Sequence, residues 1–411
     1  MRWKFGIAAW LAIMGSVSVQ AQDAAMPPAD TPEEIAKDAA RDLKGSRFYN
    51  KPGATRAQYD TDWQQCRLIA RGSRTPTGTV PMYYNPAVVS PMAAAIGGGL
   101  GGLIGAAIAE GEQRRANRRA CLLIRGWRLV EVPSDQAAGI AAMTDDARSA
   151  YFDGIVGAAE VKGEITERTS FTQVTDSALR LDAPMTGPGT LFMGKKVDPA
   201  APLVLAPGEG AVVLAFRRPD AASAGRSGQI DFARYDMTQR DLFYRPRDWK
   251  KRGDTATYLE SAMSRDRNAA YEVHVRRVTA GDYVLTGRSA GPIPVATSYC
   301  FGAPTFSVAP GQIVYLGDFI PFLNVKMSTG ARATDLIHTR HIDDVRQVLA
   351  DRQPDLAKRL EPALLRDRAT YACAAINMDR WDIDGADDLA PLTPAPTAVD
   401  PVAGASQPAA G

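Results

Sequence analysis

Residues 278–287, VTAGDYVLTG, carry the pattern that decides the fold: a short turn containing a glycine, followed by a strand of alternating apolar residues. The same pattern occurs in LAPGEGAVVLAF (residues 205–216) and in VAPGQIVYLG (residues 308–317). In each copy the glycine supplies the positive φ that a type II turn needs. We therefore expect three strands that each follow a glycine turn.

Short β-rich runs separated by Gly, Pro and Asp turns fill residues 150–388. The runs that predict strands are Leu203–Leu205, Ala211–Arg217, Gln229–Arg234, Tyr271–Val278, Asp282–Thr286, Thr305–Val308 and Gln312–Leu316. About seven short strands are typical of a sandwich or a barrel, so we expect an antiparallel β-sandwich. Near its end, His338–Asp351 and Pro354–Arg366 predict a peripheral helix pair that is interrupted at Pro354.

Helical patterns precede the strands. Thr31-Pro32-Glu33-Glu34 is typical of a helix start and predicts a leader helix that ends before Gly45 and lies on a larger body. Further helices are expected where apolar residues recur at helical spacing. These residues are Tyr59, Trp63, Cys66 and Ala70 in one helix, and the segment Glu112–Gly126 in the next.

Between these helices lies an uncharged run of 18 residues, Met92–Ala109, with six Gly and six Ala. Gly97, Gly101 and Gly105 repeat every four residues, which places bare backbone on one helix face and allows another helix to pack closely. A helix of this length reaches about 27 Å, slightly less than the roughly 30 Å hydrocarbon core of a bilayer. We favour a close-packed helical hairpin over a single membrane-spanning helix, because one crossing would separate Cys66 from Cys121.

The order of these features resembles the glycine-zipper proteins of Gram-negative envelopes. The likeness covers Tyr59–Pro133: a Trp-x-x-Cys helix, the Gly/Ala-rich run, an Arg-rich helix, and Cys121 followed by Arg125-Gly126-Trp127-Arg128. It implies association with the cell envelope rather than a reaction. Farther on, Tyr283-Val284-Leu285, Cys300 and Ile313–Gly317 weakly resemble uncharacterised bacterial secreted β-sandwich domains. That likeness implies binding or scaffolding.

The N-terminus has the features of a cleaved secretory signal. Arg2 and Lys4 precede the apolar run Phe5–Val19, and Val19-Gln20-Ala21 has the small-x-small pattern of a cleavage site. We therefore expect export to the periplasm or the outer membrane. Removing the two basic residues leaves 46 Lys and Arg against 46 Asp and Glu, a balance that disfavours nucleic acid as a partner.

Four cysteines, an even number, suit an oxidising compartment. Their positions favour two disulfides, Cys66 with Cys121 and Cys300 with Cys373, although four cysteines allow three connectivities. A zinc site is disfavoured because the sequence has no CxxC pair.

One segment mixes basic and aromatic residues as a partner-binding loop does. The partner-binding candidates are Phe243, Tyr244, Arg245, Arg247, Trp249, Lys250, Lys251 and Arg252. An envelope protein, a glycan or a lipid surface fits this chemistry. A second basic group follows the glycine-rich run and is either a lipid-facing or a solvated helix face. Its members are Arg114, Arg115, Arg118, Arg119, Arg125 and Arg128.

Catalytic patterns are weaker. Gly287–Gly291 matches GxSxG around Ser289, and Asp318 or Asp335 followed by His338 completes the order of a serine hydrolase. In such hydrolases the GxSxG motif is a nucleophile elbow, a turn that leads into a helix. Here Pro292 and Pro294 follow the motif and would break a helix.

Metal binding is also disfavoured, so we expect no metal, no cofactor and no catalytic residue. Asp335, His338 and His341 are three apart and would converge on a helix, but two histidines at this spacing are weak support for a metal. Residues 380–391 do not match the EF-hand calcium loop, because Arg380 and Pro391 occupy its first and twelfth ligand positions.

The expected fold class is therefore α+β, an N-terminal helical glycine-zipper module plus a C-terminal antiparallel β-sandwich with a peripheral helix pair. The expected organisation is a signal peptide (1–21), a linker and leader helix (22–46), the zipper module (47–133), the sandwich domain (150–388) and a disordered Pro/Ala-rich tail (389–411). The expected function is a structural or binding role in the envelope, with possible self-assembly through the zipper. The alternatives are a periplasmic hydrolase using Ser289 and His338, or a membrane pore or anchor using residues 92–109.

Overall fold

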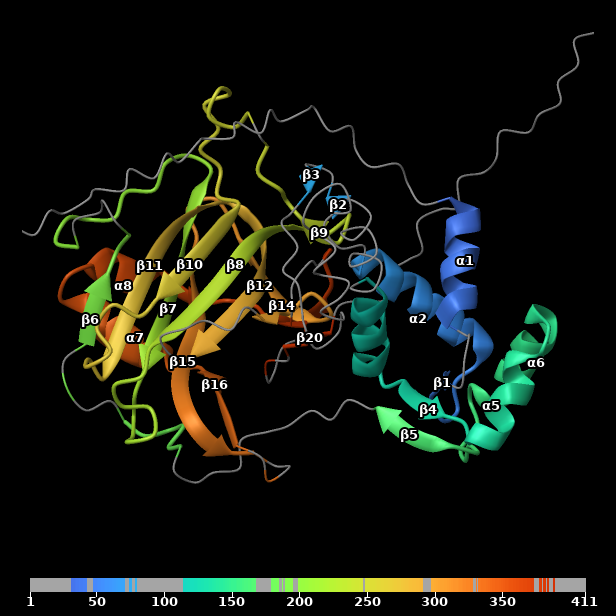
Figure 1. Ribbon diagram of the computed structural model, residues 1–411. Helices are drawn as coiled ribbons and strands as arrows, with labels where there is room; N and C mark the ends of the chain where they lie inside the picture. The colour runs from blue at the N-terminus through green and yellow to red at the C-terminus, as the bar shows by residue number, and fades with distance from the viewer. Residues whose placement is uncertain are drawn as a thin grey trace, which may run out of the picture.

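The computed structural model describes the chain between residues 31 and 388, with internal gaps. The described residues are 31–42, 47–70, 74–75, 78–79, 114–167, 179–184, 187, 189–194, 199–246, 248–290, 297–327, 330, 332–372, 377–378, 380–381, 383 and 387–388. The expected signal peptide, the glycine-rich run with Gly97, Gly101 and Gly105, and the expected tail lie outside the described residues. The N-terminal helices gather on one side of the molecule, and two large sheets with α7 and α8 form the other side, so the α+β class is confirmed (Figure 1).

The N-terminal part combines helices with a small sheet. Its helices are α1 (Pro32–Asp42), α2 (Arg56–Ile69), a helix over residues 114–124, α5 (Ser134–Ala141) and α6 (Asp145–Ile155). Its sheet has the order β1 (Arg47–Asn50), β4 (Arg128–Glu131) and β5 (Glu164–Glu167). A separate two-stranded pair is formed by β2 (Arg74–Thr75) and β3 (Gly78–Thr79).

The C-terminal part contains two sheets, here named after their central strands. The β7 sheet has the order β16 (Arg332–Thr339), β15 (Ile313–Lys326), β7 (Glu209–Arg217), β11 (Tyr271–Thr279) and β6 (Gly189–Phe192), with β17 (Leu360–Pro362) on β15. The β8 sheet has the order β10 (Leu259–Met263), β8 (Gly228–Asp236), β12 (Gly281–Ala290), β14 (Ala303–Val308), β18 (Arg366–Ala369) and β20 (Asp387–Asp388), with β9 (Asp241–Leu242) on β8. Two short strands, β13 (Thr297–Ser298) and β19 (Asn377–Met378), pair with each other and belong to neither sheet.

A glycine with positive φ precedes or begins the strand at all three positions, but only Gly208 and Gly311 have the φ near +80° that a type II turn needs. Gly208, Gly281 and Gly311 have φ values of +82°, +150° and +75°, and β7, β12 and β15 begin at or just after them. Five of the seven expected strands lie within observed strands, Gln312–Leu316 does so except for Gln312, and Leu203–Leu205 forms none. The repeated pattern therefore locates three of the longer strands of the two sheets.

Two expectations about the C-terminal part are wrong. The sheets are mixed rather than antiparallel, because β15 runs parallel to β7 and β6 runs parallel to β11. His338 lies in β16, opposite Phe319 of β15, so α7 (Ile342–Ala350) begins only after this strand. The second helix, α8 (Pro354–Arg359), is also shorter than expected, because Pro362 disfavours helical backbone at the residue before it.

Strand β7 has both faces buried, and its two faces belong to different apolar clusters. Val212, Leu214 and Phe216 join a cluster that includes inner residues of the β8 sheet and continues into the N-terminal part. Val213 and its odd-numbered neighbours join a second cluster, which α7 and α8 cover. A strand buried on both faces reads as a continuous apolar run, as residues 211–216 do.

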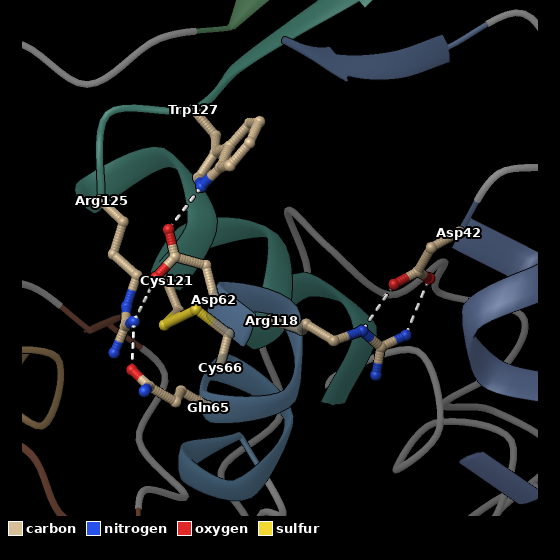
Figure 2. Close-up of a disulfide and its surroundings, with 8 residues drawn as sticks. All are labelled: Asp42, Asp62, Gln65, Cys66, Arg118, Cys121, Arg125 and Trp127. Carbon is tan, nitrogen blue, oxygen red and sulfur yellow. Dashed lines mark hydrogen bonds and ion pairs between the residues drawn. A yellow bond between two sulfur atoms is a disulfide. The ribbon is translucent and has the colours of Figure 1, made fainter. Parts of the chain in front are cut away.

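A disulfide joins Cys66 of α2 to Cys121 of the 114–124 helix, with 5.5 Å between the two Cα atoms (Figure 2). One turn earlier in α2, Asp62 accepts hydrogen bonds from Arg125 Nη1 at 2.6 Å and Trp127 Nε1 at 2.8 Å. Cys66 contacts Cys121, whereas Asp62, earlier in α2, contacts Arg125, which comes later in the chain. The two helices are therefore antiparallel. The first expected disulfide is confirmed. Residues 70 and 114, which flank the segment 71–113, consequently lie at the same end of this helix pair.

Helix α1 is attached to the same pair by a buried ion pair. Arg118 donates to both carboxylate oxygens of Asp42, at 2.6 and 2.7 Å, and both side chains are at most 5% exposed (Figure 2). The indole Nε1 of Trp63 donates to Asp42 as well, and the Arg118 guanidinium lies 5.1 Å from the Trp63 ring. The leader helix therefore packs on a larger body, as expected.

Removing the disulfide tests its part in stability. The double variant Cys66→Ala/Cys121→Ala frees a loop closed over 55 residues, and we expect the free energy of unfolding to fall by about 4 kcal/mol in the chain-entropy model. Denaturant unfolding followed by circular dichroism measures this difference. An unfolding midpoint equal to that of the unaltered chain would contradict it.

Candidate functional site

The basic aromatic segment forms a projecting connection between β9 and β10. It rises beyond the ends of the strands at the top of the two sheets (Figure 1). Immediately after it, Thr255 and Thr257 line a groove between the two sheets. The structure thus brings the expected partner-binding segment to the edge of a groove that the sequence did not predict.

Within this loop the basic and aromatic side chains stack on one another. The Arg245 guanidinium lies 4.8 Å from the Trp249 ring and 5.8 Å from the Tyr258 ring, and Lys250 Nζ lies 5.5 Å from the Trp249 ring. Each such contact contributes about 0.5–1 kcal/mol at an exposed site. The stacking holds exposed positive charges in fixed positions at the top of the sheets.

The other candidates in the loop have different surroundings. Phe243 is 40% exposed and lies under the Arg234 guanidinium, at 4.9 Å. Tyr244 donates to Asp241, and Arg252 forms an exposed ion pair with Asp248. Lys251 is exposed, and Arg247 lies outside the described residues.

The groove has a volume of about 780 Å³ and lies where the edges of the two sheets face each other. On the β7 sheet it is lined by Phe192–Gly194 after β6 and by Val275–Arg277 of β11. On the β8 sheet it is lined by Glu260 and Ser261 of β10, and by Arg265 just beyond that strand. This size is within the usual range of small-molecule and peptide-side-chain pockets.

Charged groups in the groove are poorly hydrated. Arg276 Nε lies 3.9 Å from Glu260 Oε2, and the Arg276 side chain is only 10% exposed. Burial lowers the pKa of Arg276 and raises the pKa of Glu260. Because water screens these charges weakly, an opposite charge brought by a ligand interacts with them more strongly than on an open surface.

Beneath the groove, the fully buried Glu272 of β11 organises the turn that carries Arg265. Its carboxylate accepts backbone N–H bonds from Arg265 at 3.2 Å and Asp266 at 2.6 Å. Arg218 Nη2 lies 3.5 Å from the same carboxylate, and desolvation lowers the pKa of Arg218. Glu272 is therefore a positioning residue for one wall of the groove.

His274 lies next to Glu272 on the same face of β11. The ring stacks on Phe192 at 5.2 Å, meets the edge of Phe216 at 5.3 Å, and has its Nε2 3.3 Å from Glu272. Its Nδ1 has no hydrogen-bond partner among the residues that the structure describes. Burial lowers the pKa of His274, and the Glu272 hydrogen bond only partly opposes this effect. The ring is therefore neutral near pH 7, with Nε2–H donating to Glu272.

A second polar cluster, on the opposite face of the β7 sheet, was not predicted. The buried Asp318 accepts hydrogen bonds from the hydroxyls of Tyr271 and Tyr315, each at 2.6 Å, and its other oxygen lies 2.8 Å from His341 Nδ1. A bulge at Gly317 (φ +135°) makes this possible, because it shifts Asp318 to the face of Tyr315. Burial raises the pKa of both tyrosines well above their usual value.

The structure does not bring the residues of the hydrolase alternative together in one site. Ser289 lies inside β12 rather than in a turn that opens into a helix. Asp335 forms an ion pair with Arg288 at 2.7 Å, and His338 Nε2 lies 3.0 Å from the Leu316 carbonyl. The structure pairs Asp318 with His341, not with His338. No cluster of three or more metal-ligating side chains occurs in the described part of the chain.

The basic helix after the glycine-rich run is used largely for internal contacts. Arg118 and Arg125 pair with Asp42 and Asp62, and Arg128 donates to Asn50 at 2.6 Å. For these three arginines, the expectation of a lipid-facing or solvated row is therefore corrected, because each is held by an acceptor that is distant in sequence. Among the described helices, none has both the length and the hydrophobicity that a membrane crossing requires.

Cys300 is also disulfide-bonded, while Cys373, its expected partner, lies outside the described residues. Comparison with known proteins adds no identification: no family model, no curated protein and no solved structure matches this chain.

One feature of the sequence indicated a polar site at the position of the groove. Polar residues alternate with apolar ones in YEVHVRRV (residues 271–278), and both sets prove to be largely buried. A polar series within a strand that is expected to be buried indicates a site or an internal network.

The buried histidine gives the protein a pH-dependent stability. Because the pKa of His274 lies below its ordinary value of 6.5 in the folded state, the unfolded chain binds a proton first as the pH falls below 6.5. The contribution of His274 to stability is complete above that pH and is lost as the pH falls toward the folded-state pKa. Glu272, Arg265 and Arg276 are the charged groups that act on this ring.

We expect His274→Gln, which keeps a donor for Glu272, to unfold with less pH dependence between pH 5 and 7, a window set roughly by the ordinary histidine pKa. Denaturant midpoints of both proteins across this range measure the difference. All other residues are the same in both proteins, so the difference between the two curves reports on His274. Parallel curves for the two proteins would show that His274 does not titrate in this way.

Proposed function

We propose that this chain is an exported, non-enzymatic envelope protein in which the glycine-rich segment packs against itself or a membrane and the two large sheets bind a partner. The observation that carries the proposal is the disulfide between Cys66 and Cys121. Disulfides persist in oxidising compartments and are rare in the cytosol. The apolar, signal-like start of the sequence supports the same destination.

The antiparallel helix pair supports a hairpin over a single crossing. Both ends of the 71–113 segment meet described residues at the same end of α2 and the 114–124 helix. One membrane-spanning helix would leave these ends on opposite sides. A pair of helices brought together by Gly97, Gly101 and Gly105 satisfies both the disulfide and the four-residue glycine spacing.

The partner-binding role is supported by the top of the sheets. There the stacked cations of Arg245 and Lys250 project beside a groove that contains poorly hydrated charges. The periplasm and the outer membrane both offer proteins, glycans and lipid surfaces that suit such a region.

Fractionation of the native host tests the proposal. We expect the mature chain to begin at Gln22, to be absent from the cytoplasm, and to leave the membranes in an alkaline carbonate wash. Resistance to the wash would instead favour the pore or anchor alternative, and a cytoplasmic location would contradict export.

Gly101→Leu tests the packing of the glycine-rich segment. A large side chain at this position would hold the helices apart, so we expect any self-assembly measured by light scattering to be lost. Gly139→Ala serves as a control outside this segment, because Gly139 lies in α5 and an added Cβ there meets open space. Unchanged assembly of the Leu variant would count against both the packed zipper and the pore.

A further inference from the structure

Strand β11 continues beyond the strand that covers its outer edge. On one side, β7 pairs with β11 over the whole span Tyr271–Thr279. On the other side, β6 pairs only with Tyr271–His274 and ends at Phe192. From Val275 onward, no strand among the described residues pairs with this edge, and the edge opens into the groove.

The backbone groups of this edge face the groove. The Tyr271 carbonyl accepts a hydrogen bond from Thr190 Oγ1 of β6, and the Thr279 N–H donates to Thr257 Oγ1. Both contacts lie on the side away from β7. Because the N–H and C=O of a strand residue in an antiparallel pair point to the same side and alternate along the strand, those of Arg277 also point away from β7.

The walls of the groove carry more positive than negative charge. Among the described residues, the side chains of Arg265 and Arg277 have no hydrogen-bond or ion-pair partner, and both residues are exposed. Arg276 has one carboxylate, Glu260, at 3.9 Å. The other lining carboxylate, Glu209, accepts the Ala206 N–H within its own turn. The groove therefore complements a ligand with acidic groups.

Apolar contacts are available between the charged ones. On one face of the β7 sheet, Leu203 lines the groove and is half-buried, while Val275 and Met193 beneath it are at most 3% exposed. Phe192, which stacks on His274, lines the groove on the other face. A strand laid along the edge would place alternate side chains on these two faces, since strand side chains alternate.

We propose that the groove binds an extended acidic segment of a partner envelope protein, which adds as a strand to the free edge of β11 at Val275–Val278. The inference rests on the proposed partner-binding role and names the partner's chemistry. The segment spans about four residues, or roughly 13 Å. Its backbone pairs with Arg277, its acidic side chains on one face meet Arg265 and Arg276, and its apolar side chains on the other face lie beside Leu203. Main-chain pairing provides affinity, and the alternating side chains provide specificity.

The test uses the mature full-length chain and a fluorescein-labelled peptide, Ser-Glu-Val-Asp-Val-Glu-Ser, in fluorescence polarisation. We expect saturable binding that becomes about tenfold weaker when alternate peptide nitrogens are N-methylated, because strand pairing is then lost while charge is kept. Replacing the acidic residues of the peptide by Lys is expected to abolish binding.

Variants of the chain locate the site. Arg265→Gln is expected to weaken binding by about tenfold, since it removes one charge contact. Arg277→Gln is expected to weaken binding less, because the Arg277 side chain lies on the other face of the strand from Arg276. Arg267→Gln is the matched control, because Arg267 is exposed near Arg265 but does not line the groove. Circular dichroism of all three variants checks that the fold is kept.

Several results would overturn the inference. These are no binding of the acidic peptide, equal binding of the N-methylated peptide, or equal loss with Arg267→Gln. Full competition by trigalacturonate, with no effect of N-methylation, would show that the groove takes an anionic glycan instead. The proposed envelope role fails separately, through a cytoplasmic location in the fractionation, so the two failures are distinguishable.

Discussion

The rest of the C-terminal structure depends on the burial of β7 on both of its faces. This strand pairs along one edge with β11 and along the other with β15, so its backbone polar groups are covered by neighbouring strands. Its side chains alternate between the two apolar clusters. Burying such a strand removes a large apolar area from water without leaving its amides unpaired.

That arrangement also creates the polar sites. With β7 in the centre, β11 places Glu272, His274 and Arg276 on the side of the β8 sheet, where carboxylate, imidazole and guanidinium groups lie among aromatic rings. Tyr271 lies on the opposite side and bonds to Asp318 across the sheet. Because these groups are buried or nearly so, each needs a partner, and the two networks hold the strands in one register.

Part of this fold could be predicted because its signals are local. Gly208, Gly281 and Gly311 located the starts of three strands, because glycine readily adopts a positive φ. The helical spacing of Tyr59, Trp63 and Cys66 located α2. Cysteine number and position favoured the Cys66–Cys121 pairing. Strands β10 and β16 were missed because LESAM has no β-branched residue and RATDLIHT does not alternate apolar with polar residues. Their strand conformation comes from pairing with β8 and β15.

The groove could not be predicted, because it arises from a difference in length between two strands that are far apart in sequence. β6 ends at Phe192, whereas β11 continues to Thr279, and only their register shows which residues of β11 remain uncovered. The Asp318–His341 pair likewise depends on the bulge at Gly317, which reverses the expected face of Asp318. Long-range pairing and a single irregularity thus decide where the polar side chains meet.

Native-state hydrogen exchange of the free protein tests whether a fully buried β7 lies beside a β11 whose outer edge, from Val275 onward, no described strand covers. We expect the amide of Val213 to exchange only through global unfolding, whereas the amide of Arg277 exchanges by local opening and much faster. Equal protection of the two amides would show that the edge of β11 is already covered, and the strand-addition site would then not exist.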